Sequence, residues 1–206
     1  MHPDADVLEV DPVTGRRTGL AAYARRVLRT LGESKVPYAL VGATALAVRG
    51  LPRMTRDVDV LVLIEDAFAA LDALQEAGFR SLTPIVRDAQ PEPMYVLKDK
   101  RGGEVDVHIA AGEPESTVVA EAPRATAFGV RARVATLEHL VLMYLYSNQA
   151  RHLGDLARIV TETSVDLAAV ERYLSEVHPE MLPVLRERVE MARHPAPPPP
   201  RPKRRR

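Results

Sequence analysis

The sequence predicts an α/β (α+β) fold in which a small mixed β-sheet, with helices on one face, is followed by a C-terminal helical region. In the first half of the chain, short apolar runs of strand length alternate with stretches whose apolar residues recur at helical spacing. From Thr136 to about Arg193 only the helical spacing continues. A hydrophobic content of 46% and a charged content of 27% are those of an ordinary globular protein.

These patterns divide the chain into four segments. Residues 1–17 contain Pro and Gly without a clear period, and we expect a loose leader there. Residues 18–135 form the α/β domain, and residues 136–193 form the helical region. Residues 194–206 are rich in Pro and Arg, which predicts an extended, disordered basic tail.

A helix is expected to open the α/β domain, beginning at Thr18 and ending near Gly32. The residues of its apolar stripe are Leu20, Ala24, Val27, Leu28 and Leu31. A short strand over residues 38–41 follows, because an apolar run is broken there by Gly42. A short helix over residues 43–49 comes next.

The rest of this domain alternates in the same way. Its expected elements are, in chain order, a loop over residues 51–56, a strand over 57–64, a helix over 65–77, a loop around 84–93, and strands over 94–98 and 104–110. Asp99 and the pair Gly102–Gly103 predict a turn that joins the last two strands.

The helical region is expected to hold several helices in succession. Their expected ranges are 137–149, 152–162, 167–177 and 181–192. Ser164 precedes the third helix and is a suitable N-cap for it.

The composition excludes several classes of protein. The chain contains no cysteine, which excludes disulfides, thiolate zinc sites and a cysteine nucleophile. The N-terminus lacks the apolar segment of a secretory signal, and no apolar run is long enough to span a membrane. We therefore expect a soluble, cytoplasmic protein that does not associate with membranes.

The net charge of zero conceals an asymmetry along the chain. Residues 193–206 contain six of the 28 basic residues and no acidic residue, which leaves 22 basic against 28 acidic residues elsewhere, a net charge of −6. An acidic body is a poor general binder of nucleic acid. A polyanion must therefore be met by a local basic patch or by the tail.

Two short acidic patterns predict a metal site. Asp57 and Asp59 lie in an apolar strand, where aspartate is normally avoided, and residues two apart on a strand point to the same face. The same alternation places Glu104, Asp106 and His108 on one face of a later strand. If the two strands are neighbours, Asp106 completes a cluster of three carboxylates. Such oxygen ligands suit Mg²⁺ or Mn²⁺, and a pair of these ions supports in-line attack on phosphorus.

Simpler interpretations of these residues remain open. An Asp-x-Asp pair is by itself more often structural than functional. His108 is a metal ligand, a general base or a polar residue at the end of a strand, and we favour the last.

The segment before the first aspartate is suited to bind phosphate. Gly42 lies where a strand ends and a helix begins, so backbone amides are able to approach an anion closely, and Thr44 adds a hydroxyl. Arg49, Arg53 and Arg56 follow and are able to neutralise a polyphosphate. The alternative is that the three arginines belong to a solvated surface.

This order of parts resembles the nucleotidyltransferase superfamily with the DNA polymerase β-like fold. More narrowly, it resembles the AbiEii-type toxins and uncharacterised bacterial nucleotidyltransferases related to them. The shared pattern is a strand, a Gly-Gly or Gly-Ser turn, a helix, an Arg-x-Thr-x-Asp-x-Asp segment, and a third Asp on a later strand. The matching residues, in a resemblance that covers roughly residues 36–160, are Gly42, Ala43, Arg53, Thr55, Asp57, Asp59 and Asp106.

The resemblance implies a role for each of these residues. Asp57, Asp59 and Asp106 would be catalytic: Asp57 and Asp59 would hold the metal ions, and Asp106 would bind one of them or activate the attacking hydroxyl. The nucleotide-binding residues that it implies are Gly42, Ala43, Thr44, Arg53, Thr55, Arg56 and Asp155. Relatives also carry a lysine in the helix before Asp155, and Tyr144 occupies that place here. Packing in an apolar core is the other interpretation of Tyr144.

The implied activity is metal-dependent transfer of a nucleoside monophosphate from an NTP to a hydroxyl, with Mg²⁺ or Mn²⁺ as cofactor. The acceptor would be the 3′ end of an RNA such as tRNA, or a protein side chain. The toxin role, with a cognate antitoxin as partner, follows from the resemblance alone. The alternatives are a catalytically degenerate protein of the same fold that binds NTP and metal, and a nucleic-acid-associated adaptor that acts through the basic tail.

Overall fold

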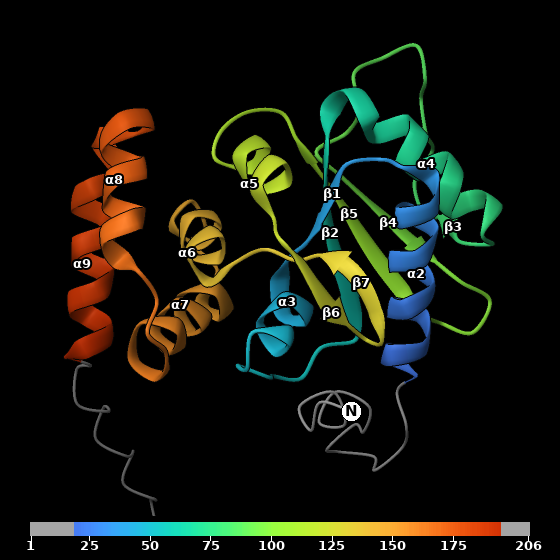
Figure 1. Ribbon diagram of the computed structural model, residues 1–206. Coiled ribbons are helices and arrows are strands. Elements are labelled where there is room, and N and C mark those ends of the chain that lie inside the picture. Colours follow the sequence, from blue (N-terminus) through green and yellow to red (C-terminus); the bar gives the residue numbers. More distant parts are fainter. Residues whose placement is uncertain (1–18, 195–206) are drawn as a thin grey trace, which may run out of the picture. The chain divides into compact units, whose positions relative to one another are not determined.

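The computed structural model describes residues 19–194 (Figure 1). The predicted leader, and the predicted tail beyond His194, lie outside the described residues. The chain divides into two compact units, Met1–Met143 and Tyr144–Arg206. The division falls within a helix, C-terminal to the domain boundary that the sequence predicts at residue 135.

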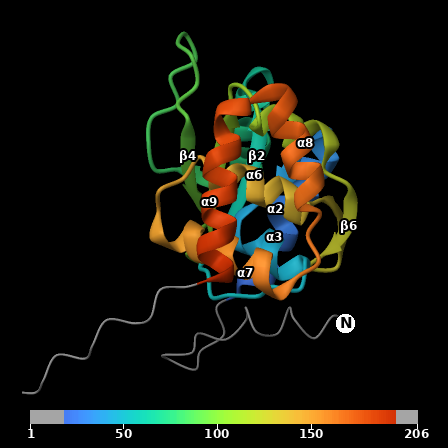
Figure 2. The same cartoon turned by 90° about the vertical axis from the view of Figure 1, so that its left-hand side faces the viewer.

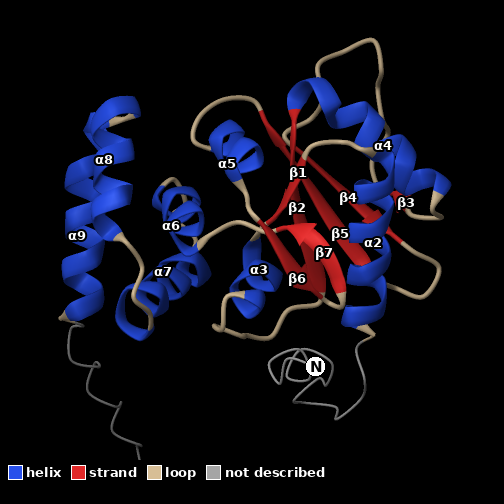
Figure 3. Cartoon of the chain, viewed as in Figure 1, coloured by secondary structure: helices blue, strands red, loops and turns tan. Residues whose placement is uncertain are grey.

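The first unit alternates helices and strands, as Figure 3 shows. Its elements are α2 (Leu20–Ser34), β1 (Tyr38–Leu40), α3 (Gly42–Val48), β2 (Asp57–Leu63), the 3-10 helix η1 (Ile64–Asp66), α4 (Ala67–Glu76), β3 (Arg80–Ser81), β4 (Met94–Lys98), β5 (Glu104–Ala110), α5 (Glu115–Glu121), β6 (Arg124–Ala127) and β7 (Val130–Arg133). The helix α6 (Leu137–Leu145) follows and crosses the division.

The main sheet has five strands in the order β1-β2-β5-β4-β3. The central pair, β2 and β5, is parallel, and the other neighbouring strands are antiparallel. This mixed sheet with its flanking helices confirms the predicted fold class. The first helix and the strands β1, β2, β4 and β5 also lie where the sequence predicts them, with boundaries that differ by a few residues at most.

The core explains why β2 and β5 form strands. Val58, Val60 and Val62 are fully buried, as are Val105 and Val107 on β5. Burial of each valine stabilises the fold by about 1.5–3 kcal/mol. Because side chains alternate along a strand, this valine face leaves the intervening acidic residues on the opposite face.

The turn between β4 and β5 determines where β5 begins. The carboxylate of Asp99 accepts hydrogen bonds from the backbone N–H groups of Arg101 (2.8 Å) and Gly103 (2.7 Å), and from the guanidinium of Arg26 on α2 (2.6 Å). A Cβ atom at Gly103 would lie 2.7 Å from the ring of Tyr23, so only glycine fits there. The turn is thereby held against α2.

Four elements of the first unit were not predicted: β3, α5, β6 and β7. The strands β6 and β7 form an antiparallel hairpin through a turn at Phe128 and Gly129. The segment after β7 joins the edge of the main sheet, because the Ala135 N–H donates to the Leu40 carbonyl at 2.9 Å. The hairpin therefore covers the β1 edge of the sheet, beside α2 (Figure 1).

The second unit is helical, as predicted. Its elements are α7 (Ala150–Glu162), α8 (Leu167–Val177), the 3-10 helix η2 (Pro179–Met181) and α9 (Leu182–Arg193). Figure 2 shows α8 and α9 side by side. The prediction that Ser164 caps α8 was wrong. Asp166 is the N-cap, and its carboxylate accepts from the Ala169 N–H at 2.9 Å. No helix within residues 19–194 has the length and apolar character needed to cross a bilayer.

Candidate metal centre

The parallel pairing of β2 with β5 brings the acidic residues of the two strands together. In this register Asp57 lies opposite Glu104, and Asp59 lies opposite Asp106. Neighbouring strands are about 4.8 Å apart, and directly paired residues project to the same face. The structure therefore places Asp106 beside the two aspartates of β2, the arrangement on which the sequence-based metal site depends.

The potential ligand atoms form two overlapping groups. One contains Asp59, Asp106 and His108, the other Asp57, Glu104 and Asp106, and within each group the ligand atoms lie within 4.8 Å of one another. Asp106 belongs to both groups. The pair of groups thus offers positions for one or two cations with Asp106 between them.

Asp106 is the most perturbed carboxylate of the cluster. Burial raises its pKa to about 6, and the negative charges of Asp59 and Asp57 add to the effect. Its Oδ1 atom is buried and has no hydrogen-bond partner among the described residues. A buried carboxylate oxygen without a partner is unfavourable, and a hard divalent cation would satisfy it. The donor set therefore fits Mg²⁺ or Mn²⁺.

His108 lies closer to the centre than the sequence indicates. Its Nε2 atom is 3.2 Å from the Asp59 Oδ1 atom, and the side chain is partly exposed. The interpretation as a polar residue at a strand end did not include this contact. The alternation Glu-Val-Asp-Val-His already places His108 on the carboxylate face, and this pattern is sufficient to predict it as part of the metal site.

Glu104 differs from Asp106 because it also forms an ion pair with a lysine. Its carboxylate is 2.8 Å from the Lys98 ammonium on the neighbouring strand β4. Part of its charge is therefore neutralised by this pair, whereas Asp106 forms no ion pair with a lysine or arginine between residues 19 and 194.

Gly42 makes room for Asp59. It has a φ of +61°, and a Cβ atom at this position would overlap the Asp59 carboxylate. The adjacent Val41 N–H donates to the Asp59 carbonyl at 3.0 Å, which ties the start of α3 to β2. The glycine that the sequence assigns to phosphate binding thus has a structural requirement of its own.

The first turn of α3 is more enclosed than the sequence predicts. Ala43 and Thr44 are buried, and the Thr44 hydroxyl donates to the Val41 carbonyl at 3.2 Å. Threonine often makes this bond to a carbonyl three residues earlier. In this structure the Thr44 hydroxyl is consequently used within the protein.

The loop before β2 carries the predicted Arg-x-Thr segment. The Thr55 hydroxyl donates to the Asp57 Oδ1 atom, and the Tyr23 hydroxyl of α2 donates to the Arg56 carbonyl. Arg53 is partly buried and donates to the Met54 carbonyl at 3.2 Å, whereas the Arg56 side chain is exposed. Hydrogen bonds therefore hold the last two residues of this loop, Thr55 and Arg56, in place.

Arg49 does not join this group of cations. Its guanidinium donates to the carbonyls of Ala135 (2.9 Å) and Val134 (2.7 Å), and burial lowers its pKa. The prediction that Arg49 neutralises a polyphosphate is corrected on this point. Two buried carbonyls at the end of the hairpin segment engage it, and no local sequence pattern reveals that contact.

Two predicted residues lie in the second unit. Asp155 on α7 is 3% exposed, and Tyr144 is 4% exposed. The ring of Tyr144 stacks on His152, with ring centroids 4.8 Å apart. This placement agrees with the packing interpretation of Tyr144. The nucleotide-binding role of Asp155 stays a prediction.

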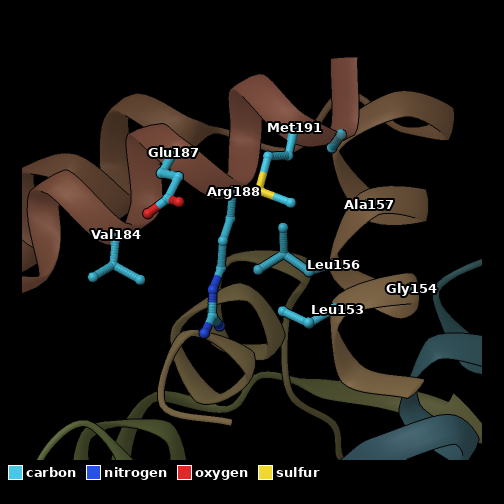
Figure 4. A pocket seen from close by; sticks show the side chains of 9 residues that line it. Leu153, Gly154, Leu156, Ala157, Val184, Glu187, Arg188 and Met191 are labelled. Atoms are coloured by element: carbon cyan, nitrogen blue, oxygen red, sulfur yellow. The ribbon is translucent and has the colours of Figure 1, made fainter. Parts of the chain in front are cut away.

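An apolar cavity of about 440 Å³ lies between α7 and α9 (Figure 4). Leu153 and Leu156 of α7 face Val184 and Met191 of α9, and Glu187 is the acidic residue on its wall. A cavity lined in this way does not supply the several oxygen donors that a divalent cation needs. The acidic cluster of the first unit is therefore the better candidate for metal chemistry.

Comparison with known proteins gives similarities of fold. No family model and no curated protein matches the sequence. One similar solved structure is the lincosamide antibiotic adenylyltransferase LnuA with lincomycin bound, which has 13% identity and a TM-score of 0.47 over 69% of this chain and 97% of that chain. The antibiotic-resistance factor ANT(2'')-Ia has 17% identity and a TM-score of 0.48 over 82% of this chain and 90% of that chain. A putative nucleotidyltransferase, TM1012, from Thermotoga maritima has 16% identity and a TM-score of 0.48 over 75% of this chain and 92% of that chain. At these identities and scores, the likeness assigns neither activity nor site residues.

Proposed function

We propose that the protein is a metal-dependent nucleotidyltransferase, which transfers a nucleoside monophosphate from an NTP to a hydroxyl acceptor. The observation that carries this proposal is the register of β2 and β5. It sets Asp57 and Asp59 beside Asp106, whose buried Oδ1 atom lacks a partner among the described residues.

Asp57, Asp59 and Asp106 would hold Mg²⁺ or Mn²⁺, with His108 and Glu104 at the edges of the two ligand groups. Divalent cations bound there would neutralise the charge of the triphosphate and favour ionisation of the acceptor hydroxyl.

The chain's own residues orient the carboxylates. The Thr55 hydroxyl holds one oxygen of Asp57, and His108 contacts one oxygen of Asp59. These bonds fix the rotamers of both aspartates, which reduces the reorganisation needed when substrate binds. In the metal-free chain burial raises the pKa of Asp106 to about 6, so the group is ionised at neutral pH and is available to hold a cation or to accept a proton from the acceptor hydroxyl.

In this proposal both backbone and side-chain groups contact the nucleotide. Arg53 and Arg56 supply positive charge from the loop that enters β2. The remaining members of the proposed set are Gly42, Ala43 and Thr44 at the start of α3, Thr55 before β2, and Asp155 on α7. For Thr44 the backbone amide is the group in question, since its hydroxyl is engaged.

The acceptor is proposed as an RNA 3′ end or a protein side chain. A toxin role, neutralised by a cognate antitoxin, is supported by the sequence resemblance to AbiEii-type proteins and by no structural observation.

A second candidate is a catalytically degenerate protein that binds NTP and metal. Tyr144 favours it, because a buried tyrosine stacked on His152 cannot supply the positive charge of the lysine that relatives carry.

Transfer can be tested directly. The full chain is incubated with Mg²⁺ or Mn²⁺, each NTP labelled at the α-phosphate, total RNA and a protein lysate, and labelled products are identified by mass spectrometry. The native chain is expected to label an acceptor, and Asp57→Asn or Asp59→Asn to reduce labelling at least about 100-fold.

Asp72→Asn is the matched control, because it removes an exposed carboxylate that pairs with Arg87 away from the cluster. Binding of NTP and Mn²⁺ by the native chain without labelling would favour the degenerate protein. Absence of both would leave the adaptor that acts through the basic tail.

A further inference from the structure

A small basic pocket lies on the first unit, at the end of β2 opposite to Asp57. There Tyr38 of β1 pairs with Val62 of β2. The pocket has a volume of about 220 Å³, and Tyr38 lies on its wall. Among the described residues, its charged lining contains one lysine and three arginines and no carboxylate: Lys35, Arg124, Arg131 and Arg133. This concentration of positive charge contrasts with the acidic body of the chain.

The register of the β6–β7 hairpin gathers the arginines. Arg124 lies opposite Arg133, and Thr126 lies opposite Arg131. Directly paired residues of an antiparallel ribbon share a face, so all three guanidiniums project from one side. The other face is made of alanines and a valine, of which Ala127 and Ala132 are buried. The hairpin thus has an apolar inner face and a cationic outer face.

Most of this charge is not neutralised by the residues that the structure describes. The side chains of Lys35, Arg124 and Arg131 are exposed and make no hydrogen bond or ion pair with another residue of the described chain. Arg133 is partly engaged, because its Nη1 atom donates to the carbonyls of Val119 (3.3 Å) and Ala120 (3.1 Å). Arg124 and Arg133 repel each other across the ribbon, an arrangement that costs stability unless an anion binds.

The charge continues along α2. Arg25 donates from Nε to the Phe128 carbonyl at 2.8 Å, so this face of α2 lies against the hairpin turn. Arg29 lies one helical turn later on the same face, between Arg25 and the pocket residue Gly32. Glu33 is adjacent and exposed but does not line the pocket. We define the hairpin patch as Arg29, Lys35, Arg124, Arg131 and Arg133.

We propose that the hairpin patch binds the phosphate backbone of a single-stranded RNA. Its cations are spread over a ribbon and a helix, which fits several phosphates in succession better than one compact anion. Guanidiniums bind phosphate oxygens in bidentate fashion. The exposed large apolar side chains of the described chain lie on other elements, so the patch lacks the residues that would insert into a lipid surface. That this RNA is also the acceptor rests on the proposed function, whereas the binding itself does not.

The test measures RNA binding without catalysis. The full chain is titrated into a short fluorescein-labelled single-stranded RNA in EDTA, without NTP, at several KCl concentrations, and fluorescence anisotropy is recorded. Replacing both Arg124 and Arg131 with alanine is expected to weaken binding about tenfold at moderate salt, and to reduce the slope of log K against log[salt] by about 1.4.

The control removes the same charge elsewhere. Arg80→Ala combined with Lys100→Ala deletes two exposed cations at β3 and after β4, away from the β1 edge. The control protein is expected to bind RNA as the native chain does, and circular dichroism should show both double variants folded. Equal affinities of the two double variants would overturn the proposal. Binding of phosphatidylserine vesicles that depends on Arg124 and Arg131, with RNA binding unaffected by them, would also overturn it.

This result separates the inference from the proposed function. A chain that binds RNA through the hairpin patch but transfers no nucleotide refutes only the transferase. A chain that transfers nucleotide while both double variants bind RNA alike refutes only the patch.

Discussion

The carboxylate of Asp59 is held from several directions by residues distant in sequence. His108 contacts one of its oxygens, Gly42 leaves the space that the other oxygen fills, and the Val41 N–H bonds its carbonyl. Because this packing leaves no room for a Cβ atom at residue 42, the position of the carboxylate depends on a residue that need not touch substrate.

We expect Gly42→Ala to abolish Mn²⁺ binding and to destabilise the protein by about 1–3 kcal/mol, because the methyl group overlaps Asp59 at a positive φ. Isothermal titration with Mn²⁺ and thermal unfolding measure the two effects. Gly50→Ala is the control, since Gly50 also has a positive φ (+87°) but has no atom within 4 Å of an added Cβ. If the two variants bind Mn²⁺ equally well, Gly42 does not position Asp59.

Asp106 makes the stability of the metal-free protein depend on pH. Its folded pKa, about 6, is above the ordinary value of 3.8, so the stabilisation from its protonated form is complete below the ordinary value and is lost as the pH rises through about 6. At pH 8 we therefore expect Mn²⁺ to raise the Tm clearly, and at pH 5 to raise it less, because a proton competes with the cation. Calorimetry at both pH values measures this difference.

Asp106→Asn is informative in the same experiment. It removes the buried charge, so the metal-free variant should be more stable than the native chain at pH 8 by about 1–2 kcal/mol. It should also lose the response to Mn²⁺ at both pH values. An equal Mn²⁺ response of the native chain at pH 5 and pH 8 would contradict the role given to Asp106.

At the scale of elements, the like charges that face each other in the β6–β7 hairpin lower the stability of the fold, and this effect can be measured. Arg124→Thr is expected to stabilise the chain by about 0.5 kcal/mol at low salt, because it removes the repulsion with Arg133 directly opposite. Arg131→Thr should have a smaller effect, since Thr126 is its partner. Urea unfolding at low and high KCl tests this, and the gain should shrink as salt screens the charges. A loss of stability in Arg124→Thr would show that an unrecognised contact engages the guanidinium.

Whether an element could be predicted depends on how clearly its local sequence pattern indicates it. Asp57, Asp59 and Asp106 could be predicted because acidic residues alternate with valine in β2 and β5, and this period of two is visible in the local sequence. The β6–β7 hairpin was missed because alanine, a weak strand former, occupies its inner face. The turn residues Phe128–Gly129 were the available signal.

Tertiary contacts set the limits of the site prediction. The position of Arg49 near Arg53 and Arg56 in the sequence predicts a phosphate contact, but the guanidinium of Arg49 donates to the carbonyls of residues 134 and 135. The contact joins residues more than eighty positions apart, which local patterns do not encode. For His108 the local pattern was sufficient, because its alternation with Asp106 is visible in the sequence. The interpretation as a polar residue at a strand end did not use this pattern.

At the scale of the whole molecule, the proposed metal ligands and Asp155 lie in different units of the chain. Asp57, Asp59 and Asp106 belong to Met1–Met143, whereas Asp155 belongs to Tyr144–Arg206. Metal affinity and nucleotide affinity should therefore respond to different substitutions.

We expect Asp155→Asn to weaken NTP binding about tenfold, because the proposed contact between its carboxylate and the nucleotide is lost. Mn²⁺ affinity should be unchanged, because Asp155 lies outside the acidic cluster. Titrations of Mn²⁺ alone and of NTP in the presence of Mn²⁺ measure the two affinities. Asp166→Asn is the control within the same unit, since it alters the N-cap of α8 and should change stability by about 1 kcal/mol or less without affecting NTP binding. If Asp155→Asn behaves like this control, Asp155 contributes no contact to the nucleotide, and its proposed role is wrong.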